Sequence, residues 1–167
     1  MKRFMHTFVG FALVLVVTAC ARRTSNTTTA VPPNGAAPAL VVGTFADDYG
    51  STYSISRTEW IQDTKTRYHV VEWHADSQYV IAQNAPTNAS DANKWPRIDW
   101  MPLSGTAPYT WGYCLSAYDA PTKAVATETR LANRATPQTG CNGFPFSRMK
   151  PLVRSPVSRS PIQEFTP

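Results

Sequence analysis

Short segments in which apolar and polar residues alternate recur along the middle of the chain. A period of two places successive side chains on opposite faces of a strand, so each segment predicts a half-buried β-strand. The predicted strands cover residues 40–45, 51–56, 67–75, 78–84, 97–103 and 109–117. The two segments with the shortest connection, 67–75 and 78–84, meet at Asp76-Ser77 and predict a β-hairpin.

One segment favours a helix instead. Residues 123–134 are rich in helix-forming side chains, with Asp119 as a candidate N-cap and Pro121 in a position that a first turn tolerates. We expect the helix to end before Pro137. Residues 141–146 then predict either a short last strand or an irregular clasp.

This order of elements predicts a mainly β fold. We expect a single antiparallel meander closed into a small barrel with one short helix, and a β-sandwich is the alternative. Strands do not alternate with helices, which disfavours a parallel α/β fold. The β-domain is expected to cover residues 40–152, which is long enough to bury about 65% of its unfolded surface.

The expected domain holds 15 aromatic residues. Strand alternation predicts a shared interior for Tyr53, Trp73, Tyr79, Trp100 and Trp111. Trp60 and Trp95 instead stand at the ends of elements, beside polar residues. Exposed aromatic side chains anchor protein partners and stack on sugar rings, so these two residues are the candidate binding residues.

Charged residues also share strand faces. Arg97 and Asp99 fall on one face of their strand, and we interpret them as a surface charge pair. Glu72, His74 and Asp76 have the same parity, which is explained by a solvated strand face as well as by a metal site. No metal site and no cofactor are expected.

The N-terminus carries the features of an export signal. Lys2 and Arg3 precede residues 8–17, which are all apolar except for Gly10. This run has the length of a signal-peptide core and is too short to span a bilayer. It ends in Val17-Thr18-Ala19-Cys20, which resembles the lipobox of bacterial lipoproteins.

The lipobox resemblance implies cleavage after Ala19 and lipidation of Cys20. Residues 1–19 are then a signal peptide, residues 20–39 a lipidated cysteine with a flexible tether, and residues 153–167 a disordered tail. Several acyl chains anchor a protein to a membrane stably. Ala21 after the cysteine implies the outer membrane under the enterobacterial sorting rule, so we expect a lipid-anchored protein of the bacterial cell envelope.

Two cysteines remain in the expected domain, Cys114 and Cys141. An even number of cysteines in an oxidising compartment predicts a disulfide. The bridge would close a loop of 28 residues and stabilise the fold by about 3.6 kcal/mol in the chain-entropy model. A reactive or metal-binding thiol pair is the alternative, without the C-x-x-C spacing that would favour it.

The later part of the domain has a recognisable pattern. Residues 94–100 read KWPRIDW, residues 111–114 read WGYC, and residues 140–146 read GCNGFPF. Together they resemble small uncharacterised bacterial lipoproteins of the cell envelope. The resemblance implies the same architecture and the same disulfide, and it implies no activity.

The net charge of +5 lies outside the expected domain. Residues 40–152 hold 10 basic and 10 acidic residues, so this part is neutral. A neutral domain does not favour a nucleic-acid groove, and no nucleic-acid partner is expected.

Catalytic motifs give no lead to an activity. The chain contains no G-x-S-x-G, no H-E-x-x-H and no phosphate-binding glycine loop. We therefore expect a non-enzymatic binding or structural domain with a protein or glycan partner. A small-ligand carrier with an aromatic-lined barrel is the alternative, and a hydrolase with an unrecognised carboxylate site is a third hypothesis.

Overall fold

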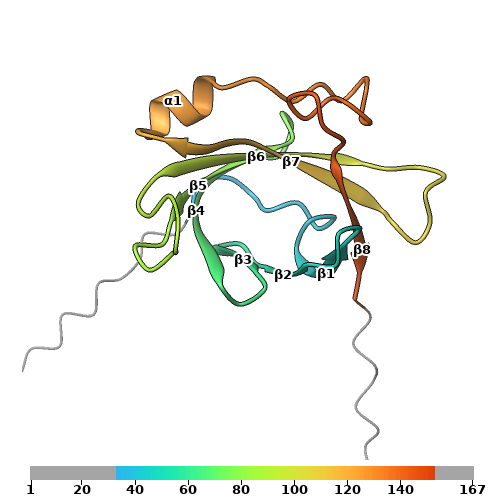
Figure 1. Cartoon of the computed structure of the whole chain (residues 1–167), viewed down its shortest axis with the longest axis horizontal. Helices are drawn as coiled ribbons and strands as arrows, with labels where there is room; N and C mark the ends of the chain where they lie inside the picture. Colours follow the sequence, from blue (N-terminus) through green and yellow to red (C-terminus); the bar gives the residue numbers. More distant parts are fainter. Residues whose placement is uncertain (1–32, 153–167) are drawn as a thin grey trace, which may run out of the picture. The chain divides into compact units, whose positions relative to one another are not determined.

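The computed structural model describes residues 33–152 and shows a closed antiparallel barrel with its eight strands in sequence order (Figure 1). The strands are β1 (Gly43–Asp47), β2 (Thr52–Ile55), β3 (Glu59–Gln62), β4 (Thr66–His74), β5 (Tyr79–Asn84), β6 (Trp95–Pro102), β7 (Trp111–Ala120) and β8 (Ser147–Pro151). The predicted closed barrel is confirmed, and the sandwich alternative is wrong. The predicted signal peptide, the lipidated Cys20 and the tail lie outside the described residues.

The last strand closes the barrel and was not predicted. Met149 in β8 lies opposite Asp47 of β1 on one side and Trp111 of β7 on the other. Residues 141–146, predicted as either a short last strand or an irregular clasp, form a turn with an isolated bridge between Cys141 and Phe144, so the clasp is the alternative that the structure shows. Strand β3 was missed as well, because Trp60 and Ile61 are adjacent in its sequence and the four residues do not alternate.

The described chain contacts the barrel before residue 40. Strand β4 extends beyond its last pair with β3, which joins Glu59 to His69. On the open stretch, the Asn34 backbone donates to the Val71 carbonyl at 3.0 Å and accepts from the Trp73 N–H at 2.8 Å. The end of the predicted tether is therefore part of the folded unit, because it satisfies backbone groups that β3 leaves without partners.

A β-bulge in β4 changes which side chains face inward. Its pairing with β5 shifts between Val70 and Glu72. Val70 and Trp73 are consequently both buried in the core, although a regular strand would put them on opposite faces. Regular alternation would also put His69 and His74 on opposite faces, but because of the bulge both lie on the outer side beside glutamates.

Aromatic rings fill the interior of the barrel. Trp60 and Trp111 meet edge to face with ring centroids 5.9 Å apart, and Phe45 meets Trp111 at 5.1 Å. Four of the five predicted interior aromatics belong to this core, namely Tyr53, Trp73, Trp100 and Trp111. Trp60 is 1% exposed, so the prediction that it offers an exposed contact is wrong.

A second layer covers one outer face of the barrel. Helix α1 (Lys123–Glu128) and the following irregular residues 129–146, together called the covering segment, lie over β6 and β7 (Figure 1). Ala126 of α1 packs with Ile81 and Ala117 in a small cluster on this side. The helix is shorter than predicted and begins after Thr122, not Asp119, because the Thr122 hydroxyl accepts the Val125 N–H. No helix among residues 33–152 has the length and apolar character needed to cross a membrane.

Candidate functional site

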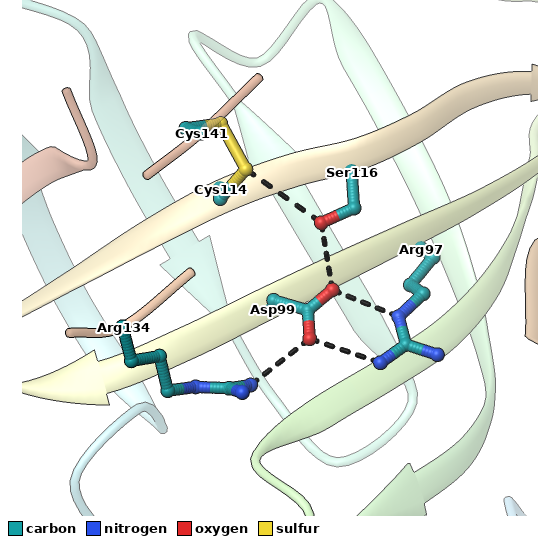
Figure 2. Close-up of a disulfide and its surroundings, with 6 residues drawn as sticks. All are labelled: Arg97, Asp99, Cys114, Ser116, Arg134 and Cys141. Carbon is teal, nitrogen blue, oxygen red and sulfur yellow. Dashed lines mark hydrogen bonds and ion pairs between the residues drawn. A yellow bond between two sulfur atoms is a disulfide. The ribbon is translucent and has the colours of Figure 1, made fainter. Parts of the chain in front are cut away.

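A buried ion-pair network holds the second layer to the barrel. Arg97 and Asp99 face outward from β6, as their shared parity predicted, but they are 6% and 1% exposed. Arg97 binds the Asp99 carboxylate in a fork, with Nε to Oδ2 at 2.8 Å and Nη2 to Oδ1 at 3.0 Å (Figure 2). The interpretation as a surface pair is wrong, because the segment after β7 returns over this face and excludes water.

Arg134 of the covering segment completes the network. Its Nη2 donates to Asp99 Oδ1 at 2.9 Å and to the Gln78 carbonyl at 2.6 Å, and its Nε donates to the Trp100 carbonyl at 2.9 Å. Ser116 of β7 donates to Asp99 Oδ2 at 2.7 Å. One carboxylate therefore accepts four hydrogen bonds from two strands and the covering segment (Figure 2).

Arg97 also fixes the helix. Its Nη1 donates to the Thr127 carbonyl at 2.7 Å, in the last turn of α1. The guanidinium lies 3.8 Å from the centre of the Tyr79 ring, and that ring stacks on His74 at 4.2 Å. Tyr79, predicted in the interior, thus lies on the outer face. It belongs with Arg97 because a guanidinium is stabilised over an aromatic ring.

The disulfide fixes the covering segment at a second point. Cys114 and Cys141 are bonded, as predicted, with their Cα atoms 5.4 Å apart. Cys141 and Phe144 exchange two backbone hydrogen bonds at 2.9 Å around the residues Asn142 and Gly143, whose φ angles are 51° and 88°. This is a two-residue turn of the type that favours Asn-Gly. It leaves Phe144 70% exposed.

A cleft of about 680 Å³ lies beside this turn, on the outside of the barrel. Its walls come from the β1–β2 turn, the end of β6 with the following loop, the covering segment and β8. The lining residues are Asp48, Tyr49, Met101, Pro102, Leu103, Ser104, Thr106, Pro137, Gln138, Pro145, Phe146 and Arg148. The volume is in the range of small-molecule and side-chain binding sites.

The base of the cleft rests on a glycine. A Cβ atom at Gly112 of β7 would lie 3.3 Å from the Phe146 Cβ and 3.6 Å from Leu103. The missing side chain therefore lets Phe146 and Leu103 approach the strand closely and form an apolar surface above it.

An ion pair stands at the rim of the cleft. Asp48 Oδ2 accepts from Arg148 Nε at 2.8 Å, and Oδ1 accepts from the Arg148 backbone N–H at 3.0 Å. The Asp48 carboxylate raises the pKa of the Arg148 guanidinium above its ordinary value. The Arg148 side chain is 50% exposed and lies 4.8 Å from the centre of the Tyr109 ring. Among the described residues, neither of its Nη atoms has a hydrogen-bond partner.

Hydrogen bonds of Asp47, Tyr53 and Tyr113 connect the core to this rim. Asp47 is buried, and its Oδ2 accepts from the Tyr53 hydroxyl at 2.8 Å while its Oδ1 accepts from the Tyr49 N–H at 3.0 Å. The Tyr53 and Tyr113 hydroxyls are 2.8 Å apart. Asp47 thus fixes the turn that presents Tyr49, which is 69% exposed.

Burial raises the pKa of three tyrosine hydroxyls in the barrel. Loss of solvation, with the neighbouring Tyr113 and Asp47, raises the pKa of Tyr53 far above its ordinary value. Burial likewise raises the pKa of Tyr68 to about 12 and the pKa of Tyr113 above its ordinary value. We call Tyr53, Tyr68 and Tyr113 the interior tyrosines.

The predicted binding residues do not line this cleft. Trp60 is inside the barrel, and Trp95 is partly buried against the small cluster of Ala117 and Ala126. Tyr49 and Arg148 were not predicted as site residues, because a turn tyrosine and a strand arginine show no pattern of their own in the sequence. The cleft exists only because segments distant in sequence meet there.

Glu72 and His74 of β4 have partners other than Asp76, which lies in the turn after the strand. Glu72 accepts from Lys123 at 2.6 Å and lies 3.3 Å from His74 Nε2, and Asp76 is exposed. The Lys123 hydrogen bond holds the pKa of Glu72 below its ordinary value. Within residues 33–152, no three His, Cys, Asp or Glu side chains gather as a set that would hold a metal ion.

Comparison of the chain with protein-family models, curated proteins and solved structures finds no match. Function is therefore inferred from the sequence motifs and from the geometry of the barrel and its cleft.

Proposed function

We propose that this chain is a bacterial envelope lipoprotein, anchored through a lipid on Cys20, whose barrel is a non-enzymatic binding module for a protein or glycan partner. The lipobox-like Val17-Thr18-Ala19-Cys20 supports the anchor and the envelope location. The outer membrane is the proposed destination, because Ala21 follows the cysteine.

The binding proposal depends on where the barrel leaves room for a ligand, which is outside it and not in its interior. The interior is filled by packed rings such as Trp60 and Trp111, which are 1% and 0% exposed. The cleft of about 680 Å³ lies outside, between the covering segment and β8. Concave surfaces with an apolar base and few polar groups are typical of binding sites.

The two alternatives gain less support. A carrier with its ligand inside the barrel would need interior room where Phe45, Trp60 and Trp111 pack against one another. A glycoside hydrolase would need two carboxyl groups facing one cleft. Asp48 is the acid among the lining residues described here, and both of its oxygens accept hydrogen bonds from Arg148.

Metabolic labelling tests the anchor. In a bacterial host given radiolabelled palmitate, the full chain is expected to take up label and to sediment with the outer membrane. Cys20→Ser is expected to lose both properties. Equal membrane association of the two proteins without label would refute lipidation.

Cross-linking in intact cells tests the binding module. A photoreactive amino acid in place of Tyr49 is expected to give one dominant cross-linked adduct. Digestion of this adduct by a protease or by a glycan hydrolase then shows whether the partner is a protein or a glycan. The matched control is the same substitution at Thr87, in the exposed β5–β6 loop at the opposite end of β6. The same adducts from both positions, or none from Tyr49, would argue against a partner at the cleft.

A further inference from the structure

We propose that the cleft binds an extended peptide segment of a partner protein that places a carboxylate on Arg148 and a neighbouring apolar side chain over Leu103. This inference deepens the proposed function, on which it rests, by choosing a peptide and naming its chemistry. The residues that it uses already line the cleft in the structure.

The carboxylate is inferred from the free donors of Arg148. Asp48 engages the Nε atom and the backbone N–H of Arg148, and the Tyr109 ring lies beside the guanidinium. The side chain is therefore held in place at the rim while both Nη atoms keep unused N–H donors. A guanidinium with two free, parallel donors matches the geometry of a carboxylate.

The charge at the rim points to an anion as well. Arg148 and Asp48 are the charged residues that line the cleft, and they neutralise each other. Lys150, two residues along β8, has its Nζ 5.8 Å from the centre of the same Tyr109 ring and leaves the rim with one net positive charge. A single carboxylate complements this charge.

The apolar group is inferred from the base of the cleft. Phe146 and Leu103 lie closely over Gly112. Phe146 is 2% exposed, so the apolar surface that a ligand can reach comes from Leu103 and from lining residues such as Met101, Pro137 and Pro145. Such a surface stabilises an apolar side chain, since about 25 cal/mol is gained for each Å² of apolar area removed from water.

A peptide fits this combination better than a glycan. Sugar hydroxyls need many hydrogen-bond partners. Here both Asp48 oxygens are engaged and the Thr106 hydroxyl donates to the Tyr109 carbonyl at 3.0 Å, so besides Arg148 and Tyr49 the polar side chains left in the lining are Ser104 and Gln138. A fatty acid also combines a carboxylate with an apolar chain, yet the rim at Tyr49 is open to solvent and would leave much of the chain wet. The exposed rings of Tyr49 and Phe144 extend the apolar surface past the cleft, as a peptide would use it.

The test begins with selection from random dodecapeptides displayed on phage, using the full chain as bait and its Arg148→Gln variant for counter-selection. We expect selected peptides to share an acidic residue within three positions of a large apolar residue. Selection of peptides without an acidic residue, or of none above the counter-selection, would overturn the proposal.

Fluorescence polarisation of one selected peptide then measures the pair. Replacing the peptide's acid by its amide is expected to weaken binding to the full chain about tenfold, and Arg148→Gln is expected to cause the same loss without adding to it. Lys94→Gln is the matched control, with the same charge change at an exposed residue at the opposite end of β6 from the cleft, and should change the dissociation constant less than about threefold. Arg148→Lys keeps the charge without the fork and should bind less tightly than the original chain. Equal losses for Arg148→Gln and Lys94→Gln would overturn the specific contact.

Leu103→Ser tests the apolar base independently of Arg148. It should weaken binding of the selected peptide severalfold, while the midpoint of thermal unfolding stays within a few degrees of that of the original chain. Unchanged binding would overturn the placement of the apolar side chain.

Binding of another kind of ligand in the cleft would give a result of its own. Arg148-dependent binding of a uronic-acid disaccharide or of dodecanoate with no selected peptide, or Arg148-dependent self-association in sedimentation velocity, would overturn the peptide proposal. None of these results depends on palmitate labelling at Cys20, so failure of the peptide inference is distinguishable from failure of the lipoprotein proposal.

Discussion

Replacing Asp99 by asparagine tests the role of the buried ion-pair network. The Asp99 carboxylate is 1% exposed and accepts hydrogen bonds from Arg97, Arg134 and Ser116. Asparagine has nearly the same shape, but its amide nitrogen donates where these groups also donate. Two guanidinium groups would then share a buried site with no anion.

The magnitude follows from the exposure of the partners. Removing one partner of a buried ion pair costs about 3–5 kcal/mol. The Arg134 side chain is 29% exposed and keeps part of its hydration, whereas the Arg97 side chain is 7% exposed and cannot. We therefore expect the lower end, a loss of about 3 kcal/mol in the free energy of unfolding, which lowers the thermal midpoint by about 10 °C for a domain of this size.

Urea unfolding followed by tryptophan fluorescence measures this loss. Asp76→Asn is the matched control, because Asp76 is an exposed turn residue, and it should change the free energy of unfolding by less than about 0.5 kcal/mol. The effect of Asp99→Asn should also shrink by at least about 1 kcal/mol when Arg134 is first replaced by glutamine, since the two residues share one contact. A loss below about 1 kcal/mol for Asp99→Asn, or full additivity with Arg134→Gln, would refute the network as described.

Three further predictions concern the core and the disulfide. The raised pKa values of the interior tyrosines mean that the unfolded chain releases protons first, so stability is intact below pH 10 and falls as the pH rises through about 12 for Tyr68. Absorbance at 295 nm should show these phenols ionising only as the protein unfolds, with a fall of up to about 4 kcal/mol per pH unit, and normal titration of all seven tyrosines in the folded protein would contradict this. Replacing Cys114 and Cys141 together by alanine should reduce the free energy of unfolding by about 3.6 kcal/mol, measured by urea titration, and a loss under about 1 kcal/mol would show that the bridge constrains little. Trp60→Ala should cost about 3–5 kcal/mol and Trp95→Ala clearly less, and the reverse order in thermal melts would contradict their assigned burial.

Local alternation was enough to predict the class of fold. Residues 67–75 and 78–84 show the strand period clearly, and they form the β4–β5 hairpin almost as expected. The disulfide followed from counting cysteines. Strand β3 does not alternate, because Trp60 and Ile61 are adjacent, and β8 is fixed by pairing with β1 and β7, which are far from it in sequence. Strand pairing supplies the information that these segments lack.

Alternation predicts the wrong face for the later part of β4, because the strand contains one inserted residue. The bulge after Val70 inserts one residue, so every later side chain changes face and Trp73 joins the core while His74 turns outward. Alternation alone cannot show a bulge, because the residues on either side remain plausible for a strand. The same limit explains Trp60, which stands beside polar residues in the chain and among aromatic rings in space.

Arg97 and Asp99 show why sequence reasoning could place a pair but not its environment. Their parity correctly put them together on the outer face of β6, where charged residues usually meet water. What changes their meaning is Arg134, which lies 35 residues after Asp99 and donates to its carboxylate at 2.9 Å. The same covering segment is bonded to β7 through the disulfide and carries Pro137, Pro145 and Phe146 into the wall of the cleft. The proposed binding surface and the buried network are thus two sides of one segment, and loosening Asp99 should disturb the cleft even though Asp99 does not line it.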